Sequence, residues 1–453
     1  MAKLPLEGIR VLDLTRAVAG TTGTLFWPFL GAELIKVEAI QRPDMPTREM
    51  QFAENDPGDQ PWNRGGYFHR LNMGKMGITL DLVNPKAAEI FKRLVAVSDV
   101  VAENYSPRAM KNFGLDYPVL SAINPGIIMV SMSGFGATGP RKDWVAYAGV
   151  MESAGLTSIT GYPDGMPMAS AVAHGDWSTG AAGAAALLTA LYYREKSGKG
   201  QHIDVSGREA IVSFLGEKVL EYTMNGRVPT RQANRHAWKA PHGCYPCQGD
   251  DSWVTIVVSN DEEWNAFCKA IGGPAWTKDE KFADGLSRWK NQEELNRLIG
   301  GWTCQRDHNE AAKILLEASV PAAPVADPKE VMMDPHLRER NFYEIIDQPV
   351  VGTRVFPKQL PAHYSVTGVA KLRPAPLLGQ HNHEVLGGIL GMSEAEIRQL
   401  EEEPVLGTEP IRTVRAKPSP MPLDAMKAGG VQVDDDYLEQ LGRFHGVKMG
   451  PHD

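Results

Sequence analysis

The sequence predicts an α/β protein whose first part is a parallel β-sheet with helices on both faces. Short apolar runs rich in β-branched residues alternate with helix patterns through residues 1–205. After residue 228 the pattern changes to a hairpin followed by amphipathic helices, which is typical of a smaller α+β unit. The length of 453 residues is enough for two or three domains.

Each strand expected in the first part is a short apolar run. The helix expected over 84–98 has the clearest start, because Asn84 is a favoured N-cap and Pro85 suits the first turn. After the first strand, a turn at 17–23 and a helix at 24–32 are expected. The expected strands cover residues 9–15, 33–38, 77–82, 99–104 and 126–133.

Domain boundaries are expected where composition and pattern change. The arm at the end of the chain is polar and weakly patterned, and is expected to be extended or partly disordered. The parts are a large domain (1–205), a linker helix (206–227), a small domain (228–330), a C-terminal segment (331–404) and the arm (405–453).

Bulk composition excludes several classes of function. A net charge of −8 argues against nucleic acid as a partner, because phosphate backbones require a basic field. No secretory signal is recognised, and no apolar run reaches the roughly 20 residues of a membrane span. Cys244 and Cys247 form one C-x-x-C without a second pair, which predicts ordinary strand cysteines and no metal site. We therefore expect a soluble, cytoplasmic protein without nucleic-acid or membrane partners.

Asp176 stands just before the least polar helix pattern of the chain. No charge occurs between Gly180 and Tyr193, and a helix is expected over 180–196. Asp176 is either an N-cap of this helix or a reagent that a substrate reaches. Ser178 and Thr179 lie nearer the helical run and are equally suited to capping, so the pattern leaves both interpretations open.

Basic residues gather in loops that follow the expected strands. Ligands of open α/β sheets bind outside the carboxyl ends of the strands, so these residues indicate a phosphate-bearing small molecule. The segment GFGATG (134–139) resembles a dinucleotide fingerprint, but Pro140 follows it and no acid ends a strand about 20 residues later. The basic residues are Lys75, Arg108, Lys111, Arg141 and Lys142.

Several motifs together resemble those of family III CoA-transferases. This is the CaiB/BaiF group, which includes formyl-CoA:oxalate and carnitine-type transferases, and the resemblance covers about residues 5–405. The motifs, in the family's order, are LPLEGIRVLDLTRAVAGTTGTLFWPFLGAELIKVE, LNMGKMGITLDLVNPKA, SDVVAENYSPRAMKNFGLDY, INPGIIMVSMSGFGATGP, HGDWSTG with AAALLTALYYREKSGKGQHIDVS, and APLLGQHNHEVL.

The resemblance implies both a fold and an activity. It implies a Rossmann-like large domain, a small domain, a C-terminal segment that returns to the large domain, and two interlocked subunits. It also implies that Asp176 is the covalent catalyst, which forms an acyl-aspartyl anhydride and then an aspartyl-CoA thioester. Coenzyme A is then a substrate, and no metal or redox cofactor is expected.

The resemblance also assigns CoA-binding positions. Lys75 and Asn104 match family residues that bind CoA, and Val18 and Ala19 lie in the turn expected against the thioester. Some relatives have Gln at the position of Val18 and Arg at that of Ala39. The glycine-rich active-site loop of formyl-CoA transferase is not recognisable, so oxalate and formate are not favoured as substrates.

Bulky residues point to a larger, partly apolar acid. Trp177 and Tyr147 are expected to line the substrate pocket. The expected donor is succinyl-CoA, and the expected acceptor is an aryl- or alkyl-substituted succinate of the benzylsuccinate type or another bulky acid.

Two alternatives remain open. The first is an acyl-CoA racemase or isomerase of the same fold, which moves an α-proton with a His/Asp pair. The racemase histidine aligns with Tyr147, and His174 is expected to point away because 171–176 is expected to be extended. The second is a scaffold subunit of a heteromer with a related chain. The expected assembly is therefore a homodimer or such a heteromer.

Overall fold

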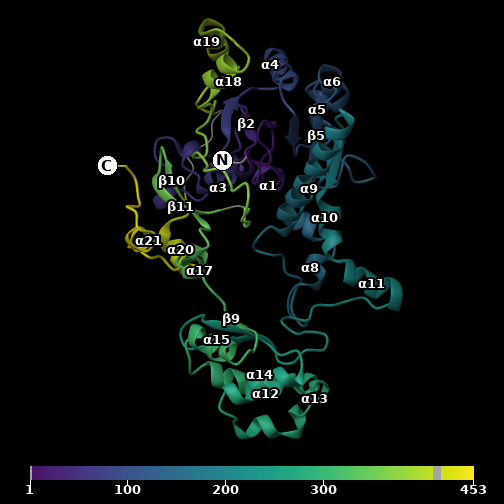
Figure 1. Ribbon diagram of the computed structural model, residues 1–453, viewed down its shortest axis with the longest axis vertical. Helices are drawn as coiled ribbons and strands as arrows, with labels where there is room; N and C mark the ends of the chain where they lie inside the picture. Colours follow the sequence, from purple (N-terminus) through teal and green to yellow (C-terminus); the bar gives the residue numbers. More distant parts are fainter. Residues whose placement is uncertain (1–2, 359, 412–419, 453) are drawn as a thin grey trace. The chain divides into compact units, whose positions relative to one another are not determined.

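The computed structural model describes residues 3–358, 360–411 and 420–452 (Figure 1). The chain divides into two compact units. The first contains Met1–Leu156, Ala169–Thr223 and Pro335–Asp453, and the second contains Thr157–Met168 and Met224–Asp334.

The structure departs from the expected domain boundaries at residues 157–168. These residues belong to the second unit and not to the large domain. Arg231 explains this placement. Its guanidinium donates hydrogen bonds to the carbonyl oxygens of Ser158, Tyr162 and Gly165, at 3.0 to 3.4 Å. The segment is therefore fastened to the chain that follows residue 224.

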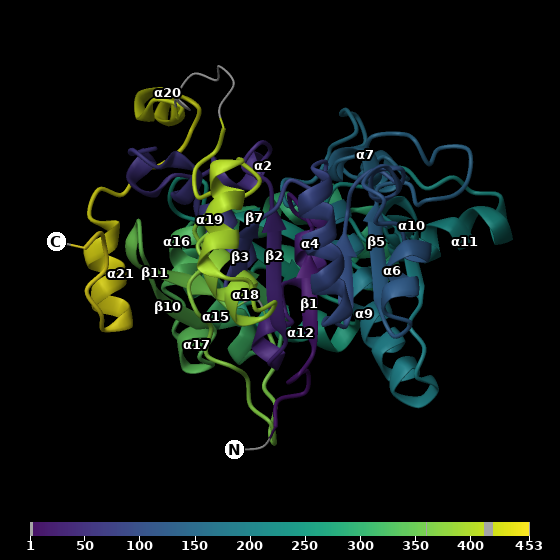
Figure 2. The ribbon, with the colours of Figure 1, turned by 90° about the horizontal axis from the view of Figure 1, so that it is seen from above.

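The first unit is built on a six-stranded parallel sheet of order β3-β2-β1-β4-β5-β6. Figure 2 shows β3, β2 and β1 side by side. From β1 the chain adds β2 and β3 on one side of the sheet and then β4, β5 and β6 on the other. The position between β1 and β4 is therefore a topological switch point. The strands are β1 (Arg10–Asp13), β2 (Glu33–Glu38), β3 (Met76–Thr79), β4 (Val100–Glu103), β5 (Ile128–Ser133) and β6 (His202–Ser206).

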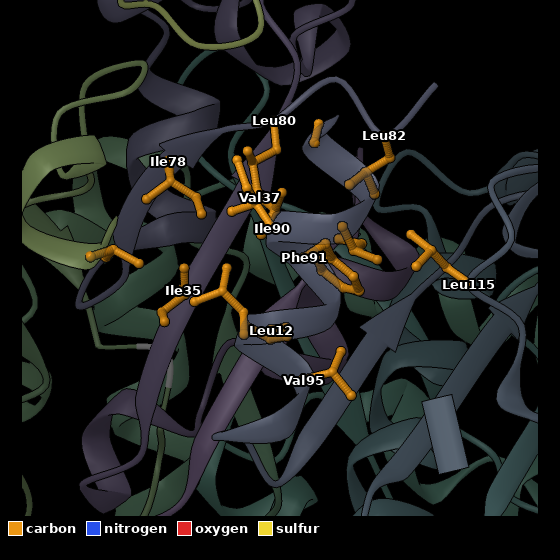
Figure 3. Packing of buried hydrophobic residues seen from close by; sticks show 14 of the residues in the cluster. Leu12, Ile35, Val37, Ile78, Leu80, Leu82, Ile90, Phe91, Val95 and Leu115 are labelled. Atoms are coloured by element: carbon orange, nitrogen blue, oxygen red, sulfur yellow. The ribbon is translucent and has the colours of Figure 1, made fainter. Parts of the chain in front are cut away.

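Helices cover both faces of this sheet, as expected. Leu12, Ile35 and Ile78 point to the face on which Phe91 of α4 packs, and Figure 3 shows this core. The opposite face packs against α9 through Leu187. The helices of the first face are α4 (Pro85–Ala96), α5 (Ala109–Asn112), α6 (Tyr117–Ile123), α18 (Asn382–Gly388) and α19 (Glu394–Glu402), and α9 is His174–Ser197.

The chain after β1 differs from expectation. Residues 24–32 form no continuous helix; instead α1 (Ala19–Thr24) occupies most of the expected turn, and a short 3₁₀ helix follows at Pro28–Leu30. Proline removes a backbone donor and clashes with the preceding turn, so a helix starts at Pro28 instead of passing through it. Gly31, with φ 93°, ends the 3₁₀ helix in the left-handed region.

A buried ion pair joins the end of β1 to two helices. The Lys75 ammonium lies 2.7 Å from Asp13 and also donates hydrogen bonds to Thr24 of α1 and Asn72 of α3 (Gly66–Asn72), at 3.0 and 3.1 Å. Both charged side chains are fully buried. Burial acts to raise the pKa of Asp13, but the charges of Lys75 and Lys36 hold it at about 2. The carboxylate therefore stays ionised inside the core.

Helix α1 packs closely against α9. A Cβ atom added at Gly180 would lie 2.5 Å from Cβ of Thr22 and 2.8 Å from the carbonyl oxygen of Ala19. Only glycine leaves room for this approach. The first turns of α1 and α9 are thus held side by side.

The rest of the first unit contains shorter elements. The helix expected at 208–226 is interrupted at Leu215. The arm expected to be extended or partly disordered contains two helices, and Gly450 pairs with Thr353 of β11; residues 412–419 of the arm lie outside the described residues. These elements are α2 (Met45–Arg48), α7 (Ala148–Glu152), α10 (Gly207–Phe214), α11 (Gly216–Asn225), α17 (Pro335–Glu339), β10 (Tyr343–Gln348), β11 (Gly352–Pro357), α20 (Leu423–Ala428) and α21 (Tyr437–His445).

The second unit is an antiparallel sheet of order β7-β8-β9 with helices packed on it. Trp264 and Phe267 of α12 lie in its core. Cys244 and Cys247 are both free thiols. The elements are β7 (His242–Pro246), β8 (Trp253–Val257), β9 (Ala322–Pro324), α12 (Asp261–Ala270), α13 (Gly285–Lys290), α14 (Gln292–Thr303), α15 (His308–Glu317) and α16 (Pro328–Met332), with α8 (Leu156–Ile159) at the boundary of the units.

The described ranges lack two features. No helix there is both long and apolar enough to cross a lipid bilayer. Within the same ranges, no three His, Cys, Asp or Glu side chains lie together in a way that would hold a metal ion.

Replacing Lys75 by methionine is expected to lower the free energy of unfolding by about 3–5 kcal/mol, because the buried charge of Asp13 loses its ion-pair partner. Urea denaturation measures the change. The matched control is Lys92→Met, which removes the more exposed pair with Glu89 and is expected to cost less than about 1 kcal/mol. The double variant Asp13→Asn/Lys75→Met is expected to recover part of the loss. If Lys75→Met and Lys92→Met were equally stable, the assigned role of the Asp13–Lys75 pair would be contradicted.

Replacing Gly180 by alanine tests the contact between α1 and α9. The added methyl group meets Thr22 and Ala19 and is expected to cost about 1–3 kcal/mol by overpacking, more than the roughly 1 kcal/mol that alanine gains in helix propensity. The thermal midpoint is therefore expected to fall. Gly216→Ala is the control, since an added Cβ there meets nothing within 4 Å. A rise of the midpoint in both variants would show that the helices are not in close contact.

Candidate active site

Asp176 lies in the first turn of α9. The helix begins at His174, so the extended conformation expected for 171–176 is wrong, and Ala173 before it adopts a left-handed conformation with φ 52°. The hydroxyl groups of Ser178 and Thr179 donate to the carbonyl oxygen of Gly175 and do not cap the helix. Within the described residues, the partly exposed Asp176 carboxylate accepts no hydrogen bond and forms no ion pair. It is therefore free to meet a ligand.

Glu152, at the end of α7, holds the segment that leads to Asp176. Its carboxylate is buried and accepts hydrogen bonds from the backbone N–H and hydroxyl of Ser170, at 3.1 and 2.9 Å, and from the N–H of Gly175, at 3.4 Å. Burial and, second, the negative charge of Glu152 raise the pKa of Asp176 to about 6. Asp176 is thus a stronger base than an ordinary aspartate.

Tyr67 and Arg70 of α3 complete this cluster. The Arg70 guanidinium lies 4.8 Å from the ring centre of Trp177, the residue after Asp176. The pKa of Tyr67 is raised above its usual value, mainly by burial. The positive charge of Arg70 acts to lower this pKa, and the negative charge of Asp176 acts to raise it. Asp176 and Arg70 therefore both lie within electrostatic reach of the Tyr67 phenol. Sequence reasoning missed Tyr67, Arg70 and Glu152, because only tertiary packing brings them to Asp176.

Asn104 fixes the turn between β1 and α1. Its Oδ1 accepts a hydrogen bond from the backbone N–H of Arg16 at 2.7 Å, and its Nδ2 donates to the carbonyl oxygen of Arg16 at 2.9 Å. Val18 occupies the N-cap position of α1, and Ala19 is its first helical residue. Asn104 thus orders the backbone of the turn.

A cleft of about 250 Å³ opens at the carboxyl ends of the strands on both sides of the switch point. Arg16 and Arg42 lie at this cleft, together with Tyr105 and Ala39. Ligands of open α/β sheets bind at this position, and the guanidinium groups of Arg16 and Arg42 favour an anionic ligand, although the carboxylates of Glu38 and Asp81 also line the cleft. Lys75 is not among its lining residues; its ammonium is buried with Asp13, Thr24 and Asn72, and its predicted contact with CoA stays a prediction.

The remaining predicted residues lie on the loops after β4 and β5. Arg108 is exposed at the N-cap position of α5, and Lys111 lines a second cleft with Glu103. Arg141 and Lys142 are exposed, and the Arg141 guanidinium lies 4.9 Å from the ring centre of Trp144. Tyr147 is 66% exposed at the N-cap position of α7, the helix that carries Glu152.

Comparison with known proteins gives a consistent result. A family profile described as CoA-transferase family III matches residues 6–382. The succinyl-CoA–D-citramalate CoA-transferase of Chloroflexus aurantiacus is 33% identical over 410 residues, which cover 89% of this chain and 98% of that protein. The succinate–glutarate CoA-transferase of Agrobacterium fabrum is 33% identical over 393 residues, covering 85% and 95%.

A solved structure extends the similarity to the fold. A CaiB/BaiF family protein from Brucella suis matches with a TM-score of 0.78 at 30% identity, over 86% of this chain and 100% of that chain. Sequence and fold thus agree over most of the chain. The protein belongs to CoA-transferase family III and is a CoA-transferase.

Proposed function

We propose that this transferase moves CoA from an acyl-CoA donor to a carboxylic acid, with Asp176 as the covalent carrier. The observation that carries the proposal is the position of Asp176: a partly exposed carboxylate in the first turn of α9 that makes no hydrogen bond or ion pair within the described residues. A nucleophile must have its oxygen free to attack, whereas an N-cap uses that oxygen to accept a backbone hydrogen bond.

The reaction proceeds in two symmetrical halves. The Asp176 carboxylate attacks the thioester carbonyl, the C–S bond breaks, and an acyl-aspartyl anhydride and CoA thiolate result. The thiolate attacks the aspartyl carbonyl of the anhydride, so that the donor acid leaves as a carboxylate and Asp176 becomes a CoA thioester. The acceptor carboxylate repeats the two steps in reverse order and leaves as the new acyl-CoA, which restores the Asp176 carboxylate.

Glu152 suits this chemistry. Its carboxylate repels the ionised Asp176, and formation of the anhydride or the thioester removes the charge of Asp176. The repulsion is therefore present in the free enzyme and absent in the covalent intermediates. An interaction that differs between the two states lowers the barrier to the acylation step.

The CoA moiety is proposed to bind along the carboxyl ends of the strands. The cleft at the switch point, with Arg16 and Arg42, fits the phosphorylated nucleotide, and the turn of Val18 and Ala19, ordered by Asn104, fits the thioester end. The predicted phosphate contacts are those of Lys75, Arg108, Lys111, Arg141 and Lys142.

We propose succinyl-CoA as donor and a substituted succinate or another bulky acid as acceptor. The similar proteins from Chloroflexus aurantiacus and Agrobacterium fabrum are named for succinyl-CoA or succinate together with a second dicarboxylic acid. The aromatic side chains of Trp177 and Tyr147 favour a substrate with an apolar part.

A second chain is proposed to complete the assembly, as an interlocked homodimer or a heteromer with a related chain. Large apolar side chains are exposed on consecutive helices of the first unit: Leu188, Tyr192 and Tyr193 on α9, Val212 and Phe214 on α10, and Val219, Leu220 and Tyr222 on α11. Exposed apolar surface of this extent is typical of protein interfaces.

Trapping of the activated Asp176 carbonyl with hydroxylamine tests the proposed function, because hydroxylamine displaces the acid or CoA and leaves a hydroxamate on Asp176. The protein is incubated with succinyl-CoA, quenched with hydroxylamine and digested, and mass spectrometry is expected to find a hydroxamate on the peptide that carries Asp176. Asp176→Asn is expected to abolish turnover and labelling but to keep CoA affinity, because the amide is nearly isosteric and does not attack. Turnover by the wild type without any label on this peptide would rule out the covalent route.

The pH dependence of acylation tests the environment of Asp176. Only the ionised carboxylate attacks, and its pKa is about 6, so kcat/KM for the acyl-CoA is expected to fall as the pH drops through about 6. Glu152→Gln removes the charge that raises this pKa and is expected to shift the acid limb to lower pH. The control Glu195→Gln changes a carboxylate near the other end of α9 and is expected to leave the limb in place. An unchanged limb in Glu152→Gln would show that Glu152 does not act on Asp176.

A further inference from the structure

Arg70 is a half-buried cation without a counter-charge. In the described part of the chain its guanidinium forms neither an ion pair nor a hydrogen bond. It makes a cation–π contact with the ring of Trp177, whose centre lies 4.8 Å from the guanidinium carbon. Removing a charge from water without a partner is unfavourable, and burial accordingly lowers the pKa of Arg70. The donors of Arg70 are therefore available for an anion from outside the chain.

Arg70 is not neutralised by Asp176, although both lie near Tyr67. No ion pair joins the Arg70 guanidinium to the Asp176 carboxylate within the described residues. Both groups nevertheless act on the pKa of Tyr67, whose hydroxyl group also has no hydrogen-bond partner within the described residues. The Asp176 carboxylate and the unpaired Arg70 guanidinium thus both act on the Tyr67 phenol, and Trp177, the residue next to Asp176, contacts Arg70. This arrangement fits a substrate that reacts at one end and carries a negative charge at the other.

We propose that Arg70 binds the free carboxylate of a dicarboxylic acyl group whose thioester end reacts with Asp176. The inference rests on the proposed function and adds a specificity-determining residue, which recognises the free carboxylate of the proposed dicarboxylic substrate. The planar guanidinium presents parallel N–H donors that match the two oxygens of a carboxylate. Tyr67, on the same helix, offers a further hydroxyl donor, and the Trp177 ring lies 4.8 Å from the guanidinium carbon and orients it from one face.

The same arrangement discriminates against monocarboxylic acyl groups. A butyryl group has nearly the shape of a succinyl group but ends in a methyl group, which leaves Arg70 without a partner. Hydrogen bonds to a charged group contribute enough that their loss is expected to reduce kcat/KM by roughly 10- to 150-fold. The preference for succinyl-CoA over butyryl-CoA is therefore expected to depend on Arg70.

Arg70→Met is the test variant, because methionine keeps an unbranched stem against Trp177 and removes the charge. Arg70→Lys keeps the charge but loses the parallel donors. The matched control is Arg398→Met, which changes an exposed arginine on α19. Thermal unfolding of each variant shows whether the fold is retained.

Steady-state kinetics with succinyl-CoA and butyryl-CoA give the first measurement. In Arg70→Met, kcat/KM for succinyl-CoA is expected to fall roughly 10- to 150-fold, mainly through KM, while kcat/KM for butyryl-CoA is unchanged or higher. Arg70→Lys is expected to lie between wild type and Arg70→Met, and Arg398→Met is expected to match the wild type. An equal loss for both acyl-CoAs would overturn the inference.

Calorimetric binding to Asp176→Asn protein gives the second measurement and requires no chemistry. Succinyl-CoA is expected to bind more tightly than butyryl-CoA, and this difference is expected to disappear in Asp176→Asn/Arg70→Met. A difference that survives without Arg70 overturns the inference, whatever the labelling of Asp176 shows. Absence of the hydroxamate on Asp176 in the wild type, with the Arg70-dependent difference intact, refutes covalent catalysis alone.

Discussion

The buried ion pair of Asp13 and Lys75 is the contact on which the arrangement of the site depends. Asp13 ends β1, and Lys75 joins it to Thr24 of α1 and to Asn72 of α3. Helix α1 then packs on α9, which carries Asp176, and α3 carries Tyr67 and Arg70. One pair of charges thus connects the sheet directly to α3, which carries Tyr67 and Arg70, and through α1 to α9, which carries Asp176. Because the pair is shielded from water, breaking it leaves Asp13 with a buried charge that the more weakly acting Lys36 and the hydroxyl groups of Thr15 and Thr24 stabilise only in part.

The site is polarised around Asp176. Glu152 supplies negative charge from α7, and Arg70 supplies positive charge from α3. Glu152 uses its oxygens on Ser170 and Gly175, so it is fixed in place and its repulsion of Asp176 does not relax by rotation. Ala173, in the left-handed region directly before α9, requires such support, because this conformation is unfavourable for a residue with a side chain.

The fold class was predictable from sequence because it depends on local patterns. The apolar runs of the first five strands mark the sheet, and the α/β fold with a smaller α+β unit and the family are confirmed. β6 (His202–Ser206) was not among the expected strands, although its alternation of polar and apolar residues is typical of a half-buried strand. The helix expected at 24–32 failed because Pro28 outweighed the apolar pattern around it.

Of the residues at the site, only those within a family motif, such as Asp176, were predictable from the sequence. Asp176 follows from the motif around it, and its role in catalysis stays a prediction. Glu152, Tyr67 and Arg70 carry no signal of their own, since a buried glutamate, a tyrosine and an arginine on short helices have no fixed spacing from Asp176. Their proximity arises from the packing of α3 and α7 around the start of α9, which no local pattern encodes.

In the proposed reaction, Arg70 acts on substrate binding and Glu152 acts on the barrier of the chemical step. The free carboxylate of a dicarboxylic acyl group is the same in the thioester, the anhydride and the released acid, so its contact with Arg70 is equally strong throughout. Such uniform binding improves KM and selects the substrate, but it leaves the barrier of the bound complex unchanged. The repulsion from Glu152 ends when Asp176 is acylated, so it acts on the chemical step itself. In the proposed reaction, substrate choice and reactivity therefore depend on different side chains, so that a change at Arg70 is expected to alter selectivity without altering the chemical step.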